Sequence, residues 1–295
     1  MHGYFRRLSA LSVVALAFSG CAESSGPTTG TLTVRLTDAP FPFSEVARVD
    51  VFVTRVEARR SEPTEAEAED ETNRGGWTTI ATPDVSINLL DLAGGVTTNL
   101  GAATLATGRY NGFRLILDTD RSSITLRDGS TPAIHFPSAG QTGIKVKLDE
   151  PIELTEDGSV VTLDFDIGRS FVMRGNTVDK GFNFKPVIRA VAQDITGSAI
   201  GSVRANSTTG AGVPGTSIEV LTAGSLLSDS DPAHVVATTA TDANGDFRIA
   251  FLLPGTYVVR ATPPAASGFK PALLPGGLTI TSGAETLVQV IVVLP

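Results

Sequence analysis

Apolar and polar residues alternate along most of this chain with a period of two. In Thr31–Thr37, leucine and valine alternate with threonine and arginine, and Val46–Arg60 repeats the pattern with Arg55 on the same face as Val49. Side chains of a strand point alternately to its two faces, so this period predicts half-buried β-strands. Further strands are expected at Trp77–Ala81, Val85–Leu90, Tyr110–Leu117, Ser122–Leu126, Gly143–Leu148, Val160–Ile167 and Phe182–Gln193.

No stretch shows a sustained period of 3.6 residues with helix caps; one helical turn is expected at residues 88–92, ended by Gly94 and Gly95. After residues 193–197 the charge falls and Gly, Ser, Thr and Ala become common, which predicts a domain boundary. The expected fold class is all-β, with β-sandwich domains at 31–194 and 195–295. Strands of the second domain are expected at Ala199–Ala205, Thr216–Leu221, His234–Thr239, Asp246–Phe251, Thr256–Ala261, Gly277–Thr281 and Glu285–Leu294.

The N-terminus has the pattern of a secretory signal. Two arginines precede the apolar run Leu8–Phe18, and Ser19-Gly20-Cys21 follows with the only cysteine of the chain. The apolar run is too short to span a bilayer, which needs roughly 20 residues. The pattern resembles a bacterial lipoprotein signal peptide, with Phe18 where leucine is usual. The resemblance implies that residues 1–20 are removed and that Cys21 is lipidated; an ordinary cleaved signal and a soluble periplasmic protein is the alternative.

The residues after the cleavage site predict how the protein is attached. Residues 21–30 are small and polar and are expected to form a flexible tether. Two or more acyl chains anchor a protein stably, so the implied partner is a membrane, contacted through the N-terminal lipid. Ala22, rather than aspartate, follows Cys21. The resemblance to lipoproteins therefore implies the outer membrane of the cell envelope, with either a periplasmic or a surface-facing orientation.

The charge of the chain is negative and excludes some partners. Removing residues 1–20 takes away Arg6 and Arg7 and no acid, so the formal charge falls from −8 to −10. An acidic chain repels phosphate backbones, so no nucleic-acid partner is expected. Six acidic residues lie in the segment 61–76, which is expected to be a solvated hairpin loop, with cation collection as the alternative.

Two motifs in the second segment carry a family resemblance. Thr241–Phe247 reads TDANGDF and Leu253–Val259 reads LPGTYVV. Together they are similar to the carboxypeptidase regulatory-like domain, a transthyretin-like β-sandwich. The first motif is expected to form a tight turn, because Asn and Gly tolerate positive φ. The acids at 242 and 246 could suggest a calcium loop, but Leu253 stands where such a loop needs glutamate.

The first segment has four motifs of its own: LTDAP (36–40), LATGRY (105–110), LDFD (163–166) and FKPVIR (184–189). They resemble an uncharacterised family of bacterial lipoproteins with a domain of unknown function, often followed by a domain of the second kind. The resemblance implies a location and a domain order, and no known activity. Tyr110 and Tyr257 each follow Gly-x at the start of an apolar strand, which suggests related sandwiches; Tyr257 is expected to donate its hydroxyl to backbone.

Nucleophilic catalysis is not expected from the available residues. Lipidation would consume Cys21, and His135 and His234 fall in different domains. The chain has no Gly-x-Ser-x-Gly elbow and no His-Glu-x-x-His motif. We therefore expect that the protein is not an enzyme.

Paired aspartates are the strongest remaining candidates for chemistry. Period two places Asp164 and Asp166 together on one strand face, and Asp118 and Asp120 repeat the spacing at an expected strand end. Such pairs could share Ca²⁺ or act as an acid–base couple, or they could form a solvated strand face or accept backbone N–H bonds. The last two interpretations are favoured, so no cofactor is expected. Trp77 is the candidate for stacking on a glycan.

The sequence therefore predicts a non-catalytic, membrane-anchored lipoprotein of the cell envelope that presents β-sandwich modules for binding or as spacers. One alternative is a carbohydrate- or peptide-binding module of an uptake system, with a glycan or an envelope protein as its partner. The other is a hydrolase that uses the paired aspartates.

Overall fold

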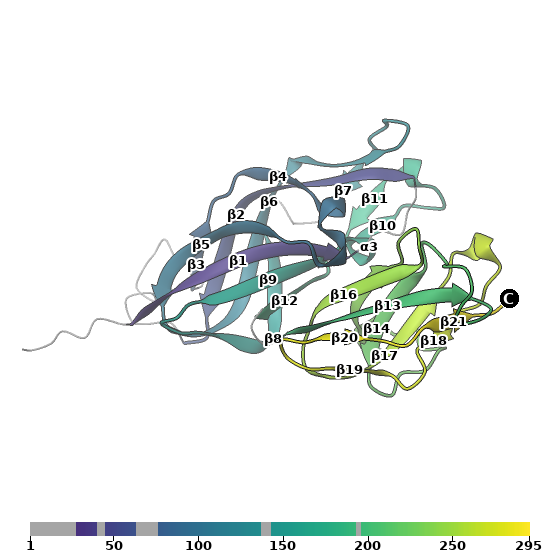
Figure 1. Cartoon of the computed structure of the whole chain (residues 1–295). Coiled ribbons are helices and arrows are strands. Elements are labelled where there is room, and N and C mark those ends of the chain that lie inside the picture. Colours follow the sequence, from purple (N-terminus) through teal and green to yellow (C-terminus); the bar gives the residue numbers. More distant parts are fainter. Residues whose placement is uncertain (1–27, 40–44, 63–75, 137–142, 193–195) are drawn as a thin grey trace, which may run out of the picture.

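The computed structural model describes residues 28–39, 45–62, 76–136, 143–192 and 196–295, which form two groups of β-sheets (Figure 1). No sheet shares strands between residues 28–192, here the N-terminal module, and residues 196–295, here the C-terminal module. Each module has its own cluster of buried apolar side chains. The expected all-β fold is confirmed. The signal at 1–20, Cys21 and most of the acidic segment, residues 63–75, lie outside the described residues.

Two sheets face one another in the N-terminal module. The first has the order β12-β9-β1-β5, with β1 antiparallel to β5 and parallel to β9. The second has the order β3-β2-β6-β8, with β4 also on β2, and a small sheet β10-β11-β7 lies at one end. The bounds are β1 (Thr29–Ala39), β2 (Val46–Arg60), β3 (Trp77–Ala81), β4 (Val85–Asn88), η1 (Leu89–Gly95), β5 (Thr98–Ala106), β6 (Gly108–Leu126), β7 (Ile134–His135), β8 (Ile144–Leu154), β9 (Ser159–Asp166), α3 (Ile167–Ser170), β10 (Phe171–Met173), η2 (Val178–Lys180), β11 (Phe182–Phe184) and β12 (Ile188–Ala192).

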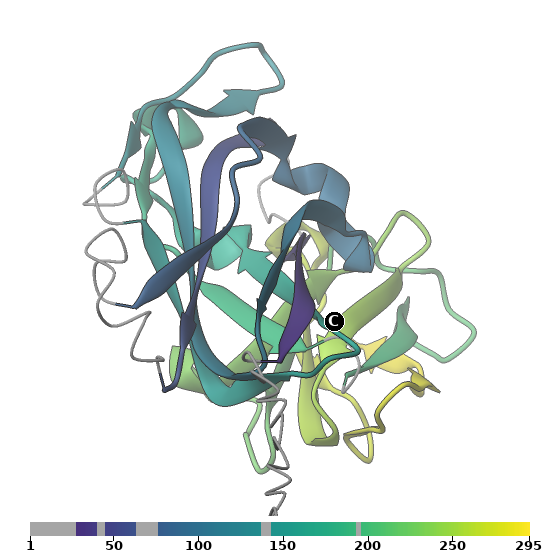
Figure 2. The ribbon, with the colours of Figure 1, turned by 90° about the vertical axis from the view of Figure 1, so that its left-hand side faces the viewer.

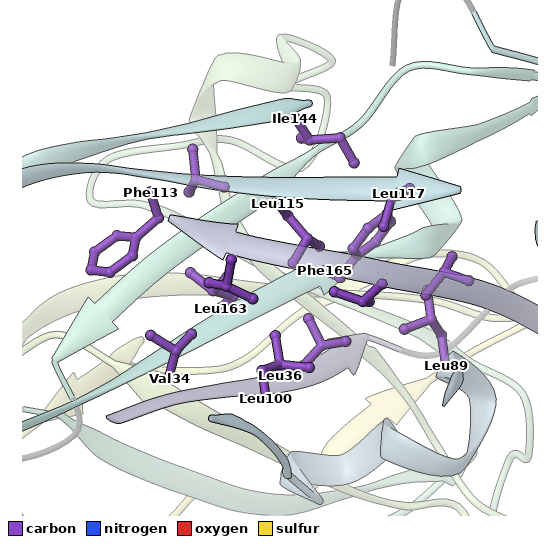
Figure 3. Close-up of a cluster of buried hydrophobic side chains, with 14 of the residues drawn as sticks. Val34, Leu36, Leu89, Leu100, Phe113, Leu115, Leu117, Ile144, Leu163 and Phe165 are labelled. Carbon is purple, nitrogen blue, oxygen red and sulfur yellow. The ribbon is translucent and has the colours of Figure 1, made fainter. Parts of the chain in front are cut away.

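The core of the N-terminal module fills the space between its two sheets. Leu36 and Phe165 from the first sheet meet Leu115 from the second, and Leu89 from η1 closes one end (Figure 3). All four side chains are fully buried. Burying such a side chain stabilises the fold by about 1.5–3 kcal/mol. The helical turn expected at 88–92 is therefore confirmed as η1, and its first leucine contributes to the core.

The C-terminal module is a smaller sandwich of the same kind. Its sheets have the orders β16-β13-β20, with β21 also on β13, and β15-β14-β17-β18, with β19 also on β17. Figure 1 shows the two modules beside each other, and Figure 2 views them from the side of the N-terminal module. The bounds are β13 (Gly197–Ala205), β14 (Ser217–Thr222), η4 (Pro232–His234), β15 (Val235–Ala240), β16 (Asp246–Leu252), β17 (Gly255–Thr262), η5 (Ala265–Ser267), β18 (Ala272–Leu273), β19 (Leu278–Ile280), β20 (Glu285–Leu287) and β21 (Ile291–Val293).

β-Bulges account for two wrong expectations about strands. Thr54 is an extra residue between the pairs Val53↔Leu117 and Arg55↔Ile116, so the alternation of β2 changes phase and Arg55 faces solvent instead of the Val49 side. On β6, four residues, 119–122, lie opposite the single residue Val51. The expected strands at 110–117 and 122–126 are therefore one strand with a large bulge.

Other differences have local causes. β5 was not expected because Gly, Ala and Asn interrupt its apolar pattern, yet it pairs along β1 and buries Leu100. The expected strand at 182–193 is two strands, because Pro186 lacks the N–H that a central ladder needs. β1 begins at Thr29, so the last two residues of the expected tether pair with β5.

Each module contains a tyrosine that closes a corner of its sandwich. The Tyr110 hydroxyl donates to the carbonyl of Ala106 at 2.9 Å, and the Tyr257 hydroxyl donates to the carbonyl of Leu253 at 2.8 Å. Both bonds reach back four residues, as in a tyrosine corner. The expected bond of Tyr257 is confirmed, and the same arrangement at Tyr110 supports the related build of the two modules.

The Tyr110 bond leads to a testable prediction about stability. The side chain is 2% exposed, so Tyr110→Phe removes a buried hydrogen bond while keeping the ring. We expect the free energy of unfolding to fall by about 1 kcal/mol, measured by urea denaturation. An unchanged free energy of unfolding would show that the bond does not stabilise the module.

Candidate functional site

Arg189 joins the two modules from the edge of the N-terminal module. It lies on β12 directly opposite Asp164 on β9; its Nε donates to Asp164 Oδ2 at 2.7 Å, and its Nη2 forms an ion pair with the same oxygen at 2.6 Å. The same guanidinium donates from Nη1 to the carbonyl of Phe251 at 3.1 Å and from Nη2 to that of Ala250 at 3.3 Å. Both carbonyls belong to β16 of the C-terminal module. Because guanidinium carries five donors in a fixed plane, one side chain serves all three acceptors. We refer to these contacts as the Arg189 clamp.

The clamp binds a strained point of the C-terminal module. Phe251 has a φ of +57°. This left-handed conformation costs a residue with a Cβ atom about 1–2 kcal/mol and is uncommon for bulky side chains. Arg189 thus binds the carbonyl of Phe251, a residue whose strained backbone conformation is maintained by its surroundings.

A second set of polar contacts surrounds Asp166, the last residue of β9. Its Oδ1 accepts the backbone N–H of Arg169 at 3.0 Å and so caps α3, while its Oδ2 accepts the hydroxyl of Thr238 on β15 at 3.0 Å. Arg169 in turn donates from Nη2 to the carbonyl of Pro232 at 2.9 Å. These contacts connect the end of β9 to η4 and β15 of the other module.

The local sequence explains why these acids face the C-terminal module. Leu163, Phe165 and Ile167 are fully buried in the N-terminal core, so period two turns Asp164 and Asp166 to the opposite face. The expected common face of the two aspartates is therefore confirmed. That face is covered by the neighbouring module at this end of the sheet, and Asp166 is only 8% exposed.

Three of the motif segments lie side by side at this end of the sheet. LDFD is on β9, and its neighbours are TDA of the LTDAP motif on β1 and the last residues of FKPVIR on β12. The register pairs Thr37 and Arg189 with Asp164 from the two sides. Asp38 of the LTDAP motif lies on β1, and its Oδ1 accepts the N–H of Ile167 at 3.2 Å. Of these motif residues, Asp166 and Arg189 contact the C-terminal module directly, through Thr238 and through the carbonyls of Ala250 and Phe251.

A groove of about 620 Å³ lies between the modules, and the clamp residues form one of its walls. The volume falls in the range of about 300–1,000 Å³ that ligand sites occupy, and an interface between modules is a frequent location for such sites. The charged lining residues are Glu153, Asp164, Asp166, Arg169 and Arg189, and most of the other lining residues are apolar. The lining comes from residues 151–153 of β8, Asp164 and Asp166 of β9, Arg169, residues 187–192 around β12, Thr222, Pro232 and Ala233 of η4, residues 235–238 of β15, Leu253 and Tyr257.

The two aspartates of the groove have different electrostatic surroundings. Burial raises the pKa of Asp166, opposed by the hydrogen bonds from the Arg169 N–H and Thr238. Asp164 forms an ion pair with Arg189 in which the side chains are 12% and 24% exposed. Because specific donors already bind both carboxylates, the arrangement is that of a structural joint rather than of an exposed pair.

The second candidate pair lies within β6 and not at a strand end, with Asp118 just before the bulge and Asp120 inside it. Asp118 Oδ1 accepts the backbone N–H groups of Asp120 and Arg121 at 3.0 and 3.2 Å, and Oδ2 pairs with Arg121 Nε at 2.8 Å. The side-chain bond from Arg121 lowers the pKa of Asp118. The Asp118 carboxylate thus stabilises the bulge, as expected for an aspartate that accepts backbone N–H bonds.

Trp77 lies half-buried on the outer face of the second sheet of the N-terminal module. The guanidinium carbons of Arg59 and Arg114 lie 5.4 and 4.7 Å from the centre of its ring. A Cβ on Gly112 would meet the ring at 3.3 Å, so the indole rests on the backbone there. Arg114 also pairs with the buried Glu57. The ring is therefore already engaged by cation–π contacts instead of being a free stacking surface.

The remaining candidates have structural partners. Asp242 Oδ1 accepts the N–H groups of Asn244 and Asp246 at 2.8 and 2.9 Å, which confirms the expected turn. His234 Nδ1 lies 2.6 Å from Asp229 Oδ2, and this bond raises the histidine pKa. His135 lies on β7 of the other module, away from His234.

Within the described ranges, no three histidine, cysteine, aspartate or glutamate side chains gather closely enough to hold a metal ion. None of the helices in the described part of the chain has the length and apolarity needed to cross a membrane. Lipidation of Cys21 falls outside these residues and stays a prediction.

Sequence reasoning missed Arg189, Arg169 and Thr238. Arg189 belongs to the FKPVIR motif, so the motif pointed to the segment without revealing its partners. Its cross-strand position opposite Asp164 depends on the register of β12 on β9. Thr238 is one of several threonines in its module, and only the packing of the modules brings it to Asp166.

Two family models match this chain. The model of DUF4382, a domain of unknown function, matches residues 29–186, and that of the carboxypeptidase regulatory-like domain matches residues 200–293. The order of the two matches confirms the order that the motifs predict. Neither description names a catalytic activity. A comparison with curated proteins found no match.

Several solved structures are similar to this chain at low superposition scores. The Bacillus anthracis TIE protein has 8% identity and a TM-score of 0.25, over 90% of this chain and 35% of that chain. A minor pilin of Streptococcus agalactiae has 16% identity and a TM-score of 0.27, over 90% and 95%. The shaft pilin SpaA of Lactobacillus rhamnosus GG has 10% identity and a TM-score of 0.24, over 92% and 98%. The chain thus spans about a third of the TIE chain, and superpositions at these scores carry no argument about function.

The raised pKa of Asp166 predicts how stability depends on pH. The folded protein binds the proton of the Asp166 carboxyl group more tightly than the unfolded chain does. Asp166 therefore lowers the free energy of unfolding as the pH rises from the ordinary pKa of aspartate to the raised pKa of Asp166. The variant Asp166→Asn cannot titrate. Between about pH 4 and pH 7, we expect urea denaturation to show the variant gaining stability relative to the wild type.

Asp118→Asn is the control with the opposite sign, because the pKa of Asp118 is lowered in the folded protein. Its stabilising effect is present above the ordinary pKa of aspartate and lost on acidification. This variant should therefore lose stability relative to the wild type as the pH rises from about 2 to about 4, and its difference from the wild type should change little between about pH 4 and pH 7. A parallel trend for both variants would contradict the burial of the Asp166 charge.

Proposed function

The chain belongs to the DUF4382 family and carries a carboxypeptidase regulatory-like module after it, and from this premise we propose that it is a non-catalytic lipoprotein of the cell envelope. In this proposal the lipid on Cys21 anchors the chain in the outer membrane. The two β-modules act as one unit, and the groove between them is the binding site.

The engagement of Asp164 and Asp166 carries the non-catalytic part of the proposal. An acid–base couple needs carboxyl groups that can exchange protons with a substrate and its attacking water. Asp164 is instead paired with Arg189, and both oxygens of Asp166 accept bonds from the protein itself. The same groove is mostly apolar and large enough for a ligand. These features favour binding without turnover over the hydrolase alternative.

The surroundings of Trp77 favour the groove over a glycan surface on the outer sheet. A sugar that stacked on the indole would have to displace Arg59 or Arg114 from the ring. It would also compete with the ion pair between Arg114 and the buried Glu57. Trp77 therefore supports the sheet, and the groove is the better candidate for a ligand.

The placement of the modules suits an N-terminal anchor. β1 starts at the far left end of the molecule in Figure 1, and the C-terminal module lies toward the opposite end. A lipid on Cys21 would therefore leave the C-terminal module away from the membrane. Ala22, rather than aspartate, follows the cysteine and supports the outer membrane as the location.

Cell fractionation tests the anchor. Cys21→Ala removes the only thiol that can be acylated, so we expect nearly all of the variant to leave the membrane fraction. Ala22→Asp keeps the cysteine and serves as the control: it should stay membrane-bound and move to the inner membrane. If the Cys21→Ala variant stays in the membrane fraction, the proposed anchor is wrong.

A further inference from the structure

Edge strands of both modules border the groove, and we propose that it binds an extended, basic polypeptide segment as an added β-strand. This inference rests on the proposed function, in which the groove is a ligand site, and it names the chemical class of that ligand. Three independent features point to it: unpaired strand edges, an apolar lining, and a carboxylate at the rim.

The first edge belongs to β12, which is the last strand of its sheet among the strands that the structure describes. It pairs with β9, and the carbonyl of Val187 accepts the N–H of Asp166 at 3.0 Å. Hydrogen-bonded and non-hydrogen-bonded pairs alternate in an antiparallel ladder. Residues 189 and 191 therefore direct their backbone groups to β9, whereas Ile188 and Ala190 direct theirs to the opposite side. Both of these residues line the groove.

The second edge belongs to β15, the last strand of its own sheet. The N–H of Thr241 donates to the carbonyl of Thr216 at 3.0 Å, which fixes the alternation along the β14–β15 ladder. By the same rule, Thr238 directs its backbone N–H and C=O groups away from β14, and the alternation ends at the bulge residue Val236. Thr238 also lines the groove. Backbone donors and acceptors from two modules are thus available around one cavity.

The lining between the two edges suits an extended chain. Five residues of β12 span roughly 16 Å at about 3.3 Å per residue, and an added strand of similar length would pair with the outward-facing backbone groups of Ile188 and Ala190. The apolar residues beside the edges include Ile152, Val191 and Val235. Strand addition obtains affinity from main-chain hydrogen bonds and specificity from pockets for alternate side chains. Small apolar side chains at alternate positions would fit this lining.

Charge complementarity selects a basic segment. Arg169 and Arg189 already bind carboxylates and carbonyls of the joint. Glu153 on the rim has a 61% exposed side chain and only a 3.9 Å contact with Arg109, which is also largely exposed. Such exposed pairs contribute little, so Glu153 can bind a lysine or arginine of a ligand. The acidic chain, with a net charge of −8, also attracts a cationic partner over long range.

Binding of a defined peptide tests the proposal. The probe is fluorescein-labelled acetyl-Lys-Val-Thr-Val-Thr-Val-amide, titrated with the full chain and followed by fluorescence anisotropy. We expect saturable binding that weakens by about tenfold or more when alternate amides of the peptide are N-methylated, because these donors bond to the strand edges. Replacing lysine by glutamate in the probe should also weaken binding, and Glu153→Lys should reverse that preference.

Matched protein variants locate the binding. Ala233→Trp fills the groove from an exposed position on η4, and Ala243→Trp places the same side chain on an exposed turn that does not line the groove. The first variant should bind the probe about tenfold more weakly or worse, and the second should bind like the wild type. Thr222→Trp, at another exposed lining position, repeats the test if Ala233→Trp perturbs folding. Equal binding by the blocked variants, or by the N-methylated probe, would overturn the proposal.

A neutral dye separates this inference from the proposed function. Nile red needs an apolar site but no strand partner. If Nile red binds and is excluded by Ala233→Trp while the peptide does not bind, the groove remains a ligand site and strand addition is wrong. If neither probe binds in a way that depends on the groove, both proposals are wrong.

Discussion

The structure depends on strand β9, because one of its faces packs into the N-terminal core and the other forms the joint with the C-terminal module. Leu163 and Phe165 of β9 are fully buried in the N-terminal core, and this forces Asp164 and Asp166 onto the opposite face. A carboxylate that is removed from water is costly unless charges and donors compensate for it. Arg189 supplies that compensation for Asp164 and binds the C-terminal module with its remaining donors. Core packing and the joint between modules are therefore linked through adjacent residues of the same strand.

This link explains why the joint and the groove occur together. β12 carries Arg189 into the clamp and at the same time forms one edge of the groove, and β15 carries Thr238 to Asp166 and forms the other edge. The contacts that hold the modules together thus set the distance between the two strand edges. Truncating Arg189 would leave the mostly buried Asp164 carboxylate without its cation, at a cost of about 3 kcal/mol. A looser joint would change the shape of the groove as well as the angle between the modules.

The sequence predicted the features that depend on near neighbours. Period two in 163–167 placed both aspartates on one face, the TDANGDF motif formed its turn, and Tyr257 found its backbone partner. Features that depend on register were not predicted. The bulge at Thr54 turns Arg55 outward, and the bulge of β6 joins two expected strands, because one extra residue changes the phase of everything after it. The contacts of Arg189 and Thr238 depend on segments distant in sequence, so no local pattern could reveal them. The same is true of the two arginines, Arg59 and Arg114, that lie over the Trp77 ring.

The most direct measurement of the central claim is the distribution of distances between the two modules. Spin labels at Thr104→Cys and Ser228→Cys, both exposed, report this distance by pulsed electron paramagnetic resonance in a Cys21→Ala background. The account predicts a single narrow distribution for the clamped protein and a clearly broader one for Arg189→Met. Arg48→Met, which removes an exposed arginine paired with Asp50, should leave the distribution narrow. An equally narrow distribution for Arg189→Met would contradict the claim that the Arg189 clamp makes the two modules one unit.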